Sequence, residues 1–129
     1  MELAFEVSTR FGVSPEVVYH AWLNSKQHSE MTGGAASVSD EIGGRFEAWD
    51  GYISGTNLAL EPGRRIVQSW RTVEFQESEG NSQVEILLTE IPGGTELTLR
   101  HTQLPPHGEQ YRQGWEDHYF TPMRAWFSR

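Results

Sequence analysis

The last stretch of the chain, residues 108–129, constrains the fold more than any other segment. Its large aromatic residues recur at the spacing of one face of an α-helix, and polar residues fall on the opposite face. This aromatic face comprises Tyr111, Trp115, Tyr119 and Trp126. Burying one such side chain contributes roughly 1.5–3 kcal/mol, so a helix of this kind does not stay in water. The preceding chain must therefore supply a concave apolar surface for it.

The first third of the chain predicts a strand followed by short helices. Residues 3–9 alternate between apolar and polar side chains, which is typical of a half-buried strand. Ser14 can cap a helix and Pro15 suits its first position, so a helix is expected to begin here. Residues 24–32 are polar and predict at most a short, weakly packed second helix, which ends at Gly33.

The middle of the chain has the signals of strand, turn and strand as far as residue 104. Asp50 and Gly51 predict a hairpin turn, and Gly55 lies inside the following strand, where it predicts a bulge or a bend. Residues 95–101 show the clearest alternation in the chain. This pattern indicates a meander of antiparallel strands.

Together these elements predict an α+β fold with a single domain spanning residues 1–129. One strand, one or two short helices, a run of antiparallel strands and a long helix follow in that order. Because most connections are short, we expect a curved antiparallel sheet of about six or seven strands wrapped around the long C-terminal helix. Where the inner sheet face is not fully apolar, a cavity remains between sheet and helix.

Charge and composition narrow the classes of partner. Ten Lys and Arg residues against eighteen Asp and Glu residues give a formal charge of −8, which repels phosphates, so no nucleic-acid partner is expected. Solubility alone also explains such an excess of acid. Cysteine is absent, the N-terminus lacks the features of a secretory signal, and no apolar run approaches the length that spans a bilayer. We therefore expect a cytoplasmic protein without membrane insertion.

Three segments resemble one known family. Residues 50–55 (DGYISG), 97–105 (LTLRHTQLP) and 43–46 (GGRF) are similar to strands of the family related to the activator of the heat-shock-protein-90 ATPase, and the likeness extends over nearly the whole chain. The resemblance implies a helix-grip, START-like fold of the SRPBCC superfamily, which often encloses a ligand-sized apolar cavity. It also implies a domain of the C-terminal type, because the family's co-chaperones carry a separate N-terminal domain that docks on the chaperone.

The chain departs from the family's pattern in two places. Residues 24–32 are more polar than the family's second-helix segment, and Thr121 and Pro122 interrupt the last helix. Proline inside a helix removes a backbone hydrogen bond and clashes with the preceding turn, at a cost of about 3 kcal/mol. We therefore predict a kink or a break at Thr121.

The candidate ligand-binding residues are aromatic or lie on the expected inner face of the sheet. His101 shares a strand face with Leu97 and Leu99, so its imidazole could anchor a ligand or serve as a general acid or base. The alternatives are a buried, hydrogen-bonded imidazole for His101 and core packing for each aromatic residue. The predicted ligand-binding residues are Trp22, Phe46, Trp70, His101, Trp115 and Tyr119.

Other catalytic or metal-binding arrangements find no support in the sequence. His118 lies at the edge of the aromatic face, whereas His20, His28 and His107 are expected at exposed or loop positions without metal-ligand spacing. No pair of carboxylates is placed on one inward face, and neither a nucleophile elbow nor a phosphate-binding glycine loop occurs. We expect no metal, no cofactor and no assigned catalytic residue.

Three functions remain open. The first is non-catalytic binding of a hydrophobic or amphipathic small molecule, which requires a cavity of at least roughly 300 Å³. The second, which follows from the resemblance, is a co-chaperone-like interaction that stimulates a chaperone ATPase. The third is an enzyme that uses His101 together with another polar group in the cavity. We favour binding, and the sequence leaves open a monomer or a homodimer.

Overall fold

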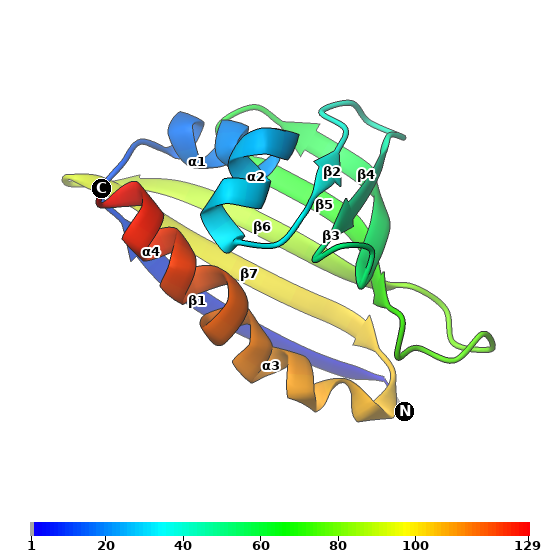
Figure 1. The fold of residues 1–129 in the computed structure, drawn as a ribbon. Coiled ribbons are helices and arrows are strands. Elements are labelled where there is room, and N and C mark those ends of the chain that lie inside the picture. The colour runs from blue at the N-terminus through cyan, green and yellow to red at the C-terminus, as the bar shows by residue number, and fades with distance from the viewer. Residues whose placement is uncertain (1) are drawn as a thin grey trace.

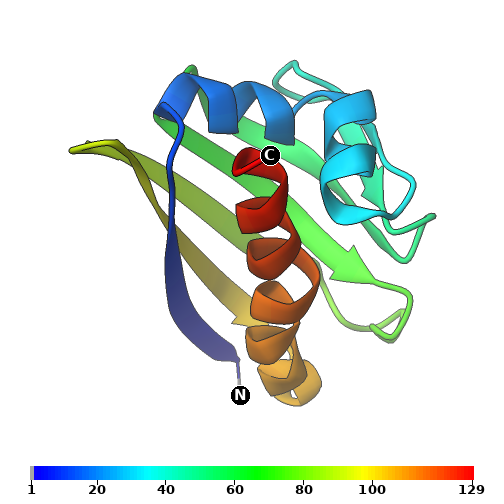
Figure 2. The same cartoon turned by 60° about the vertical axis from the view of Figure 1, so that its left-hand side comes forward.

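A computed structural model describes residues 2–129, which form an antiparallel sheet curved around a C-terminal helix (Figures 1 and 2). The strands in this part of the chain are β1 (Leu3–Phe11), β2 (Ser37–Val38), β3 (Arg45–Ala48), β4 (Ile53–Glu61), β5 (Arg65–Thr72), β6 (Ser82–Ile91) and β7 (Gly94–Leu104). Their order in the sheet is β1-β7-β6-β5-β4-β3-β2. The predicted α+β, helix-grip architecture is confirmed.

The helical elements form two groups. Those after β1 are α1 (Pro15–Trp22) and α2 (Ser25–Thr32), and those after β7 are η1 (Pro106–Glu109), α3 (Gln110–Trp115), η2 (Glu116–Phe120) and α4 (Thr121–Phe127). The last three follow one another without a gap and form the long C-terminal helix, which lies across the concave face of the sheet (Figure 2). The first pair closes one end of the sheet (Figure 1).

The centre of the core is the β6–β7 hairpin, which the C-terminal helix covers. Leu97, Leu99 and His101 of β7 are fully buried, as the alternation in this strand predicts. They pair across the ladder with Leu88, Ile86 and Val84 of β6. The strand therefore presents a continuous apolar row with one imidazole at its end.

The two short helices begin where the sequence places them. The Ser14 side chain accepts a hydrogen bond from the Val17 amide, and Pro15 occupies the first turn of α1. The α2 helix ends at Gly33, whose φ of 85° is left-handed. Although α2 is polar, it buries His28 and Met31. The prediction of a weakly packed helix with an exposed His28 is therefore wrong, because the His28 ring is buried and hydrogen-bonded to the Trp22 carbonyl and the Tyr119 hydroxyl.

Gly55 serves a purpose other than the predicted bulge. The register of the β4–β5 ladder shifts between Asn57 and Ala59, so the irregularity lies two residues or more beyond the glycine. At Gly55 an added Cβ would collide with the carbonyl oxygen of Ser69 and with the Phe46 ring. Glycine is therefore required by the close approach of neighbouring backbone and ring.

The C-terminal helix continues through Pro122 (Figure 2), so of the kink or break predicted at Thr121 the break does not occur. The five residues of η2 form a turn of π-helix, in which the Thr121 amide donates to the Glu116 carbonyl five residues earlier. Pro122 has no amide hydrogen, and its ring would clash with the carbonyl four residues before it in a regular α-helix. The wider turn relieves this conflict without ending the helix.

The described residues contain no helix that is both long enough and apolar enough to cross a membrane.

Candidate functional site

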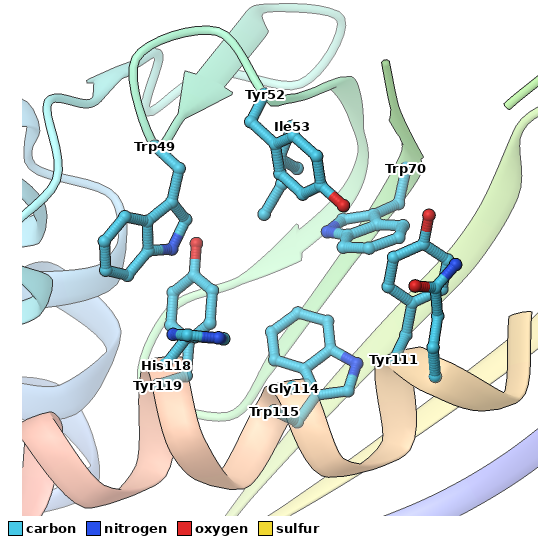
Figure 3. A pocket seen from close by; sticks show the side chains of 10 residues that line it. Trp49, Tyr52, Ile53, Trp70, Tyr111, Gly114, Trp115, His118 and Tyr119 are labelled. Atoms are coloured by element: carbon cyan, nitrogen blue, oxygen red, sulfur yellow. The ribbon is translucent and has the colours of Figure 1, made fainter. Parts of the chain in front are cut away.

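A partly open cavity of about 380 Å³ lies between the C-terminal helix and the β3–β4 turn (Figure 3). In Figure 3, Trp49, Tyr52 and Ile53 stand on one side and helix residues stand on the other. The cavity is lined by Trp49, Tyr52, Ile53, Trp70, Gln110, Tyr111, Gly114, Trp115, His118 and Tyr119. Six of these ten residues are Trp or Tyr, so aromatic rings form most of the wall.

The helix wall combines ordinary helical spacing with the π turn. Tyr111 and Trp115 are four residues apart on α3, and Gly114 between them leaves open space where a side chain would stand. His118 and Tyr119 follow within the π turn, and both line the cavity. Single π turns inside α-helices occur frequently at functional sites.

The opposite wall comes from the sheet. Trp70 of β5 lies with its ring centroid 5.6 Å from that of Trp115, at an interplanar angle of 39°. Trp115 in turn lies 4.9 Å from the ring of Tyr119. The three rings form a continuous tilted row that separates the cavity from the packed core.

Trp49 breaks two local rules at the rim of the cavity. Its φ is +53°, a left-handed conformation that costs a non-glycine residue roughly 1–2 kcal/mol. Its indole N–H is buried and faces the Tyr119 hydroxyl, without a hydrogen bond of normal geometry (Figure 3). The ring lies so close to Gly34 that an added Cβ there would collide with it. His118 meets the ring edge-on at 5.7 Å, so Trp49 closes one end of the cavity.

The other end of the cavity is polar. The Tyr52 hydroxyl donates to the carboxylate of Glu74, and the hydroxyl of Tyr111 hydrogen-bonds the Thr72 hydroxyl at 2.6 Å. Burial raises the pKa of Tyr52, and its hydrogen bond to Glu74 raises it further. The tyrosine therefore remains a neutral hydrogen-bond donor at neutral pH, and the negative charge stays on Glu74.

Behind Tyr119, a buried histidine links two helices. His28 Nδ1 lies 2.8 Å from the carbonyl oxygen of Trp22, and Nε2 lies 3.2 Å from the hydroxyl of Tyr119. Since a carbonyl only accepts, Nδ1 carries the proton and the Tyr119 hydroxyl donates to Nε2. Burial lowers the pKa of His28 and raises the pKa of Tyr119, so both groups are neutral.

His101 lies behind the row of aromatic rings and does not line the cavity. Its Nδ1 accepts a hydrogen bond of 3.0 Å from the Trp115 indole, so Nε2 carries the proton and lies 2.9 Å from the Ser82 hydroxyl. Ser82 then donates to the Trp70 carbonyl oxygen at 2.7 Å. Burial lowers the pKa of His101 to about 3. Both ring nitrogens are engaged, and the imidazole is neutral at neutral pH.

The structure divides the six predicted binding residues into two sets of three. Trp70, Trp115 and Tyr119 line the cavity. The other three are buried in the core behind it: Trp22, Phe46 and His101. Trp22 donates its indole N–H to Gln68 at 3.2 Å and packs on Tyr119, whereas Phe46 packs against Gly55.

Sequence reasoning did not select several wall residues. Tyr111 and His118 were placed on or near the aromatic face but were not selected, although their helical positions were a usable signal. The remaining unselected residues are Trp49, Tyr52, Ile53, Gln110 and Gly114. Trp49 and Tyr52 flank the predicted Asp50–Gly51 turn, and the left-handed backbone of this turn extends back to Trp49.

Residues 2–129 contain no group of three or more His, Cys, Asp or Glu side chains that could hold a metal ion.

Comparison with known proteins finds relatives that are named as activators of a heat-shock-protein ATPase. Residues 12–128 match the model of the family "Activator of Hsp90 ATPase homolog 1-like protein". The human activator of 90 kDa heat shock protein ATPase homolog 1 is 30% identical over 118 residues, which cover 91% of this chain and 35% of the human protein. A Dictyostelium discoideum homologue is 28% identical over 126 residues, covering 95% of this chain and 32% of its own length. The chain thus spans about a third of these relatives.

Solved structures show the same fold. An HSP90 activator from Plasmodium falciparum superposes with a TM-score of 0.89 at 22% identity, covering 98% of this chain and 96% of that one. The Aha1 dimer from Colwellia psychrerythraea superposes with a TM-score of 0.79 at 13% identity, covering 95% of each chain. Likeness at these identities concerns the fold alone.

Proposed function

The chain belongs to the family of Activator of Hsp90 ATPase homolog 1-like proteins, and from that premise we propose that it binds a hydrophobic or amphipathic small molecule, without catalysis, in the cavity between sheet and helix. The cavity of about 380 Å³ exceeds the size that such a ligand requires. At the packing density of protein interiors it admits a ligand of up to about 20 non-hydrogen atoms.

The observation that carries this proposal is that two departures from regular local structure lie at the cavity. Trp49 adopts a left-handed conformation with an unpaired buried N–H, and η2 is a π turn. Both departures line the same cavity. Each has an energetic cost, and departures of this kind concentrate at functional sites.

The most direct test fills the cavity from the helix. Leucine in place of Gly114 would project into open space and occupy part of the cavity, while improving helix propensity. We expect Gly114→Leu to keep or slightly raise the midpoint of urea unfolding and to abolish binding of the neutral fluorescent dye 6-propionyl-2-dimethylaminonaphthalene. Gln113→Leu adds the same side chain at an exposed neighbouring position and should leave dye binding unchanged. Equal dye binding by both variants would contradict the proposal.

Native mass spectrometry of the protein purified from its own host supplies the physiological ligand. We expect a non-covalent adduct that is present in the wild-type protein and missing from Gly114→Leu. An adduct that both proteins retain would lie outside this cavity.

A second candidate function is stimulation of a chaperone ATPase, which the names of the matched relatives favour. The chain spans about a third of those relatives, so the test asks whether this segment stimulates the chaperone by itself. The test is the ATP turnover of purified Hsp90 with increasing amounts of this chain. Turnover that stays unchanged at a large excess would exclude this function.

Catalysis through His101 is not proposed. That hypothesis requires His101 and another polar group to converge inside the cavity. The imidazole instead lies behind the wall, with both nitrogens engaged by Trp115 and Ser82.

A further inference from the structure

The walls of the cavity are rich in π-electron faces and carry no fixed positive charge. None of the ten wall residues is Lys or Arg, and the one histidine among them, His118, is exposed. An anionic ligand would therefore lose its hydration without gaining a cationic partner. The formal charge of −8 for the whole chain disfavours anions further.

Negative charge instead lies at the polar end of the cavity. Glu74 accepts the hydrogen bond of the Tyr52 hydroxyl, and Tyr52 is a wall residue. Burial raises the pKa of Tyr111, and the negative charges of Glu74 and Glu79 add to the rise. The carboxylate of Glu74 is thus held at this end by its hydrogen bond to a wall residue.

The basic side chains near this end, Arg71 and His107, do not line the cavity. The Arg71 guanidinium lies over the Phe75 ring, 5.4 Å from its centroid, and donates to the carbonyl oxygens of Gln76 and Glu79. His107 lies 2.9 Å from the Glu79 carboxylate. The hydrogen bonds of both side chains are therefore directed to residues 76 and 79 rather than into the cavity.

Aromatic faces and a nearby carboxylate are the elements that recognise organic cations. The negative face of a Trp or Tyr ring attracts an ammonium group, more strongly where water is excluded. The polar end brings together the rings of Tyr52, Trp70 and Tyr111 (Figure 3), and Glu74 accepts the hydrogen bond of the Tyr52 hydroxyl. The other end offers the apolar surfaces of Trp115 and Tyr119 to the rest of a ligand.

We propose that the cavity takes an amphipathic organic cation, in which an alkylated or quaternary ammonium group lies among Tyr52, Trp70 and Tyr111 near Glu74 and an apolar body extends along Trp115. This inference rests on the proposed binding function and names the chemical class of the ligand. A neutral or anionic ligand of the same shape binds more weakly.

The test compares three naphthyl probes of similar length and different charge, of which the cation and the neutral probe have equal shape. They are 2-(naphthalen-2-yl)ethyl-trimethylammonium, its neutral isostere with a tert-butyl group in place of the trimethylammonium group, and the anion 4-(naphthalen-2-yl)butanoate. Their affinities are measured by displacement of the neutral dye. We expect the cation to bind roughly fivefold to thirtyfold more tightly than the isostere, with the anion weakest.

Two variants separate local from overall charge. Glu74→Gln removes the carboxylate but retains an acceptor for Tyr52, and it should weaken the cation about threefold or more while leaving the neutral isostere unchanged. Glu77→Gln changes the net charge equally within the same exposed loop, at a residue that does not contact Tyr52, and it should leave all three affinities unchanged.

The outcomes distinguish this inference from the function on which it rests. An isostere that binds as tightly as the cation, or a Glu74→Gln variant that weakens both probes alike, overturns the inference and leaves ligand binding standing. If no probe and no dye binds, both the inference and the proposed function fail.

Discussion

The surroundings of the Trp115 ring differ between its two sides, although one helix holds the ring. Toward β7, its indole N–H is bonded to His101, whose second nitrogen reaches Ser82, and the packing is complete. Toward the β3–β4 turn lies a cavity of about 380 Å³, across which Trp49 holds a buried N–H without a partner.

This difference shows that buried polar groups in this protein have two uses. On the His101 side, both imidazole nitrogens and the Trp115 indole N–H have hydrogen-bond partners, which stabilises one arrangement of helix and sheet. On the Trp49 side, strain and an unpaired donor persist because the surrounding contacts hold them there. The first side serves the fold, and the second is where we propose function.

The largest effect should come from removing the imidazole on the packed side. His101→Leu leaves the Trp115 indole N–H buried without an acceptor, so we expect the free energy of unfolding to fall by about 3–4 kcal/mol in urea denaturation. His118→Leu, on the exposed cavity side, should change it by less than about 0.5 kcal/mol. Losses of equal size in both variants would remove the contrast between the two sides.

The same substitution on either side of the cavity gives a second comparison. Trp115→Phe deletes a paired N–H and leaves His101 Nδ1 buried without a donor, which should cost about 2–3 kcal/mol. Trp49→Phe deletes an unpaired N–H and should change stability by less than about 1 kcal/mol in the same denaturation experiment. A larger loss for Trp49→Phe would show that its N–H is satisfied in solution.

Lowering the pH should reduce the free energy of unfolding over a defined range, through the buried histidines. Burial lowers the pKa of His101 to about 3 and also lowers the pKa of His28 below its ordinary value of 6.5. Below pH 6.5 the unfolded chain therefore binds more protons than the folded chain, and the free energy of unfolding falls as the pH drops. Each histidine contributes up to about 1.4 kcal/mol per pH unit.

The range between pH 6.5 and about 5 isolates the histidines. The lowered pKa values of Glu79 and Glu116, which arise mainly from hydrogen bonds, add a loss of stability only below their ordinary value of 4.5. Urea denaturation at several pH values should show a slope that His101→Leu reduces by about half. An unchanged slope in that variant would mean that His101 is protonated in the folded protein.

Local patterns predicted the elements well and the walls of the cavity less well. The helix start at Ser14, the alternation in β7 and the aromatic face of the last helix all arise from contacts between near neighbours in the chain. The π turn and the left-handed Trp49 were missed, because Pro122 could be accommodated in more than one way and the turn signal at Asp50 and Gly51 did not indicate that the left-handed run begins at Trp49.

By itself, the sequence determined that an aromatic helix must be covered by a curved antiparallel sheet, since hydrophobic periodicity is a local property and burial of the rings dominates the energy. Only the tertiary structure decided that side chains fill the space on one side of Trp115 and that a cavity lies on the other side. That outcome depends on how far β3 and β4 stand from the helix and on which groups meet His101. Such distances are set by packing between segments distant in the chain.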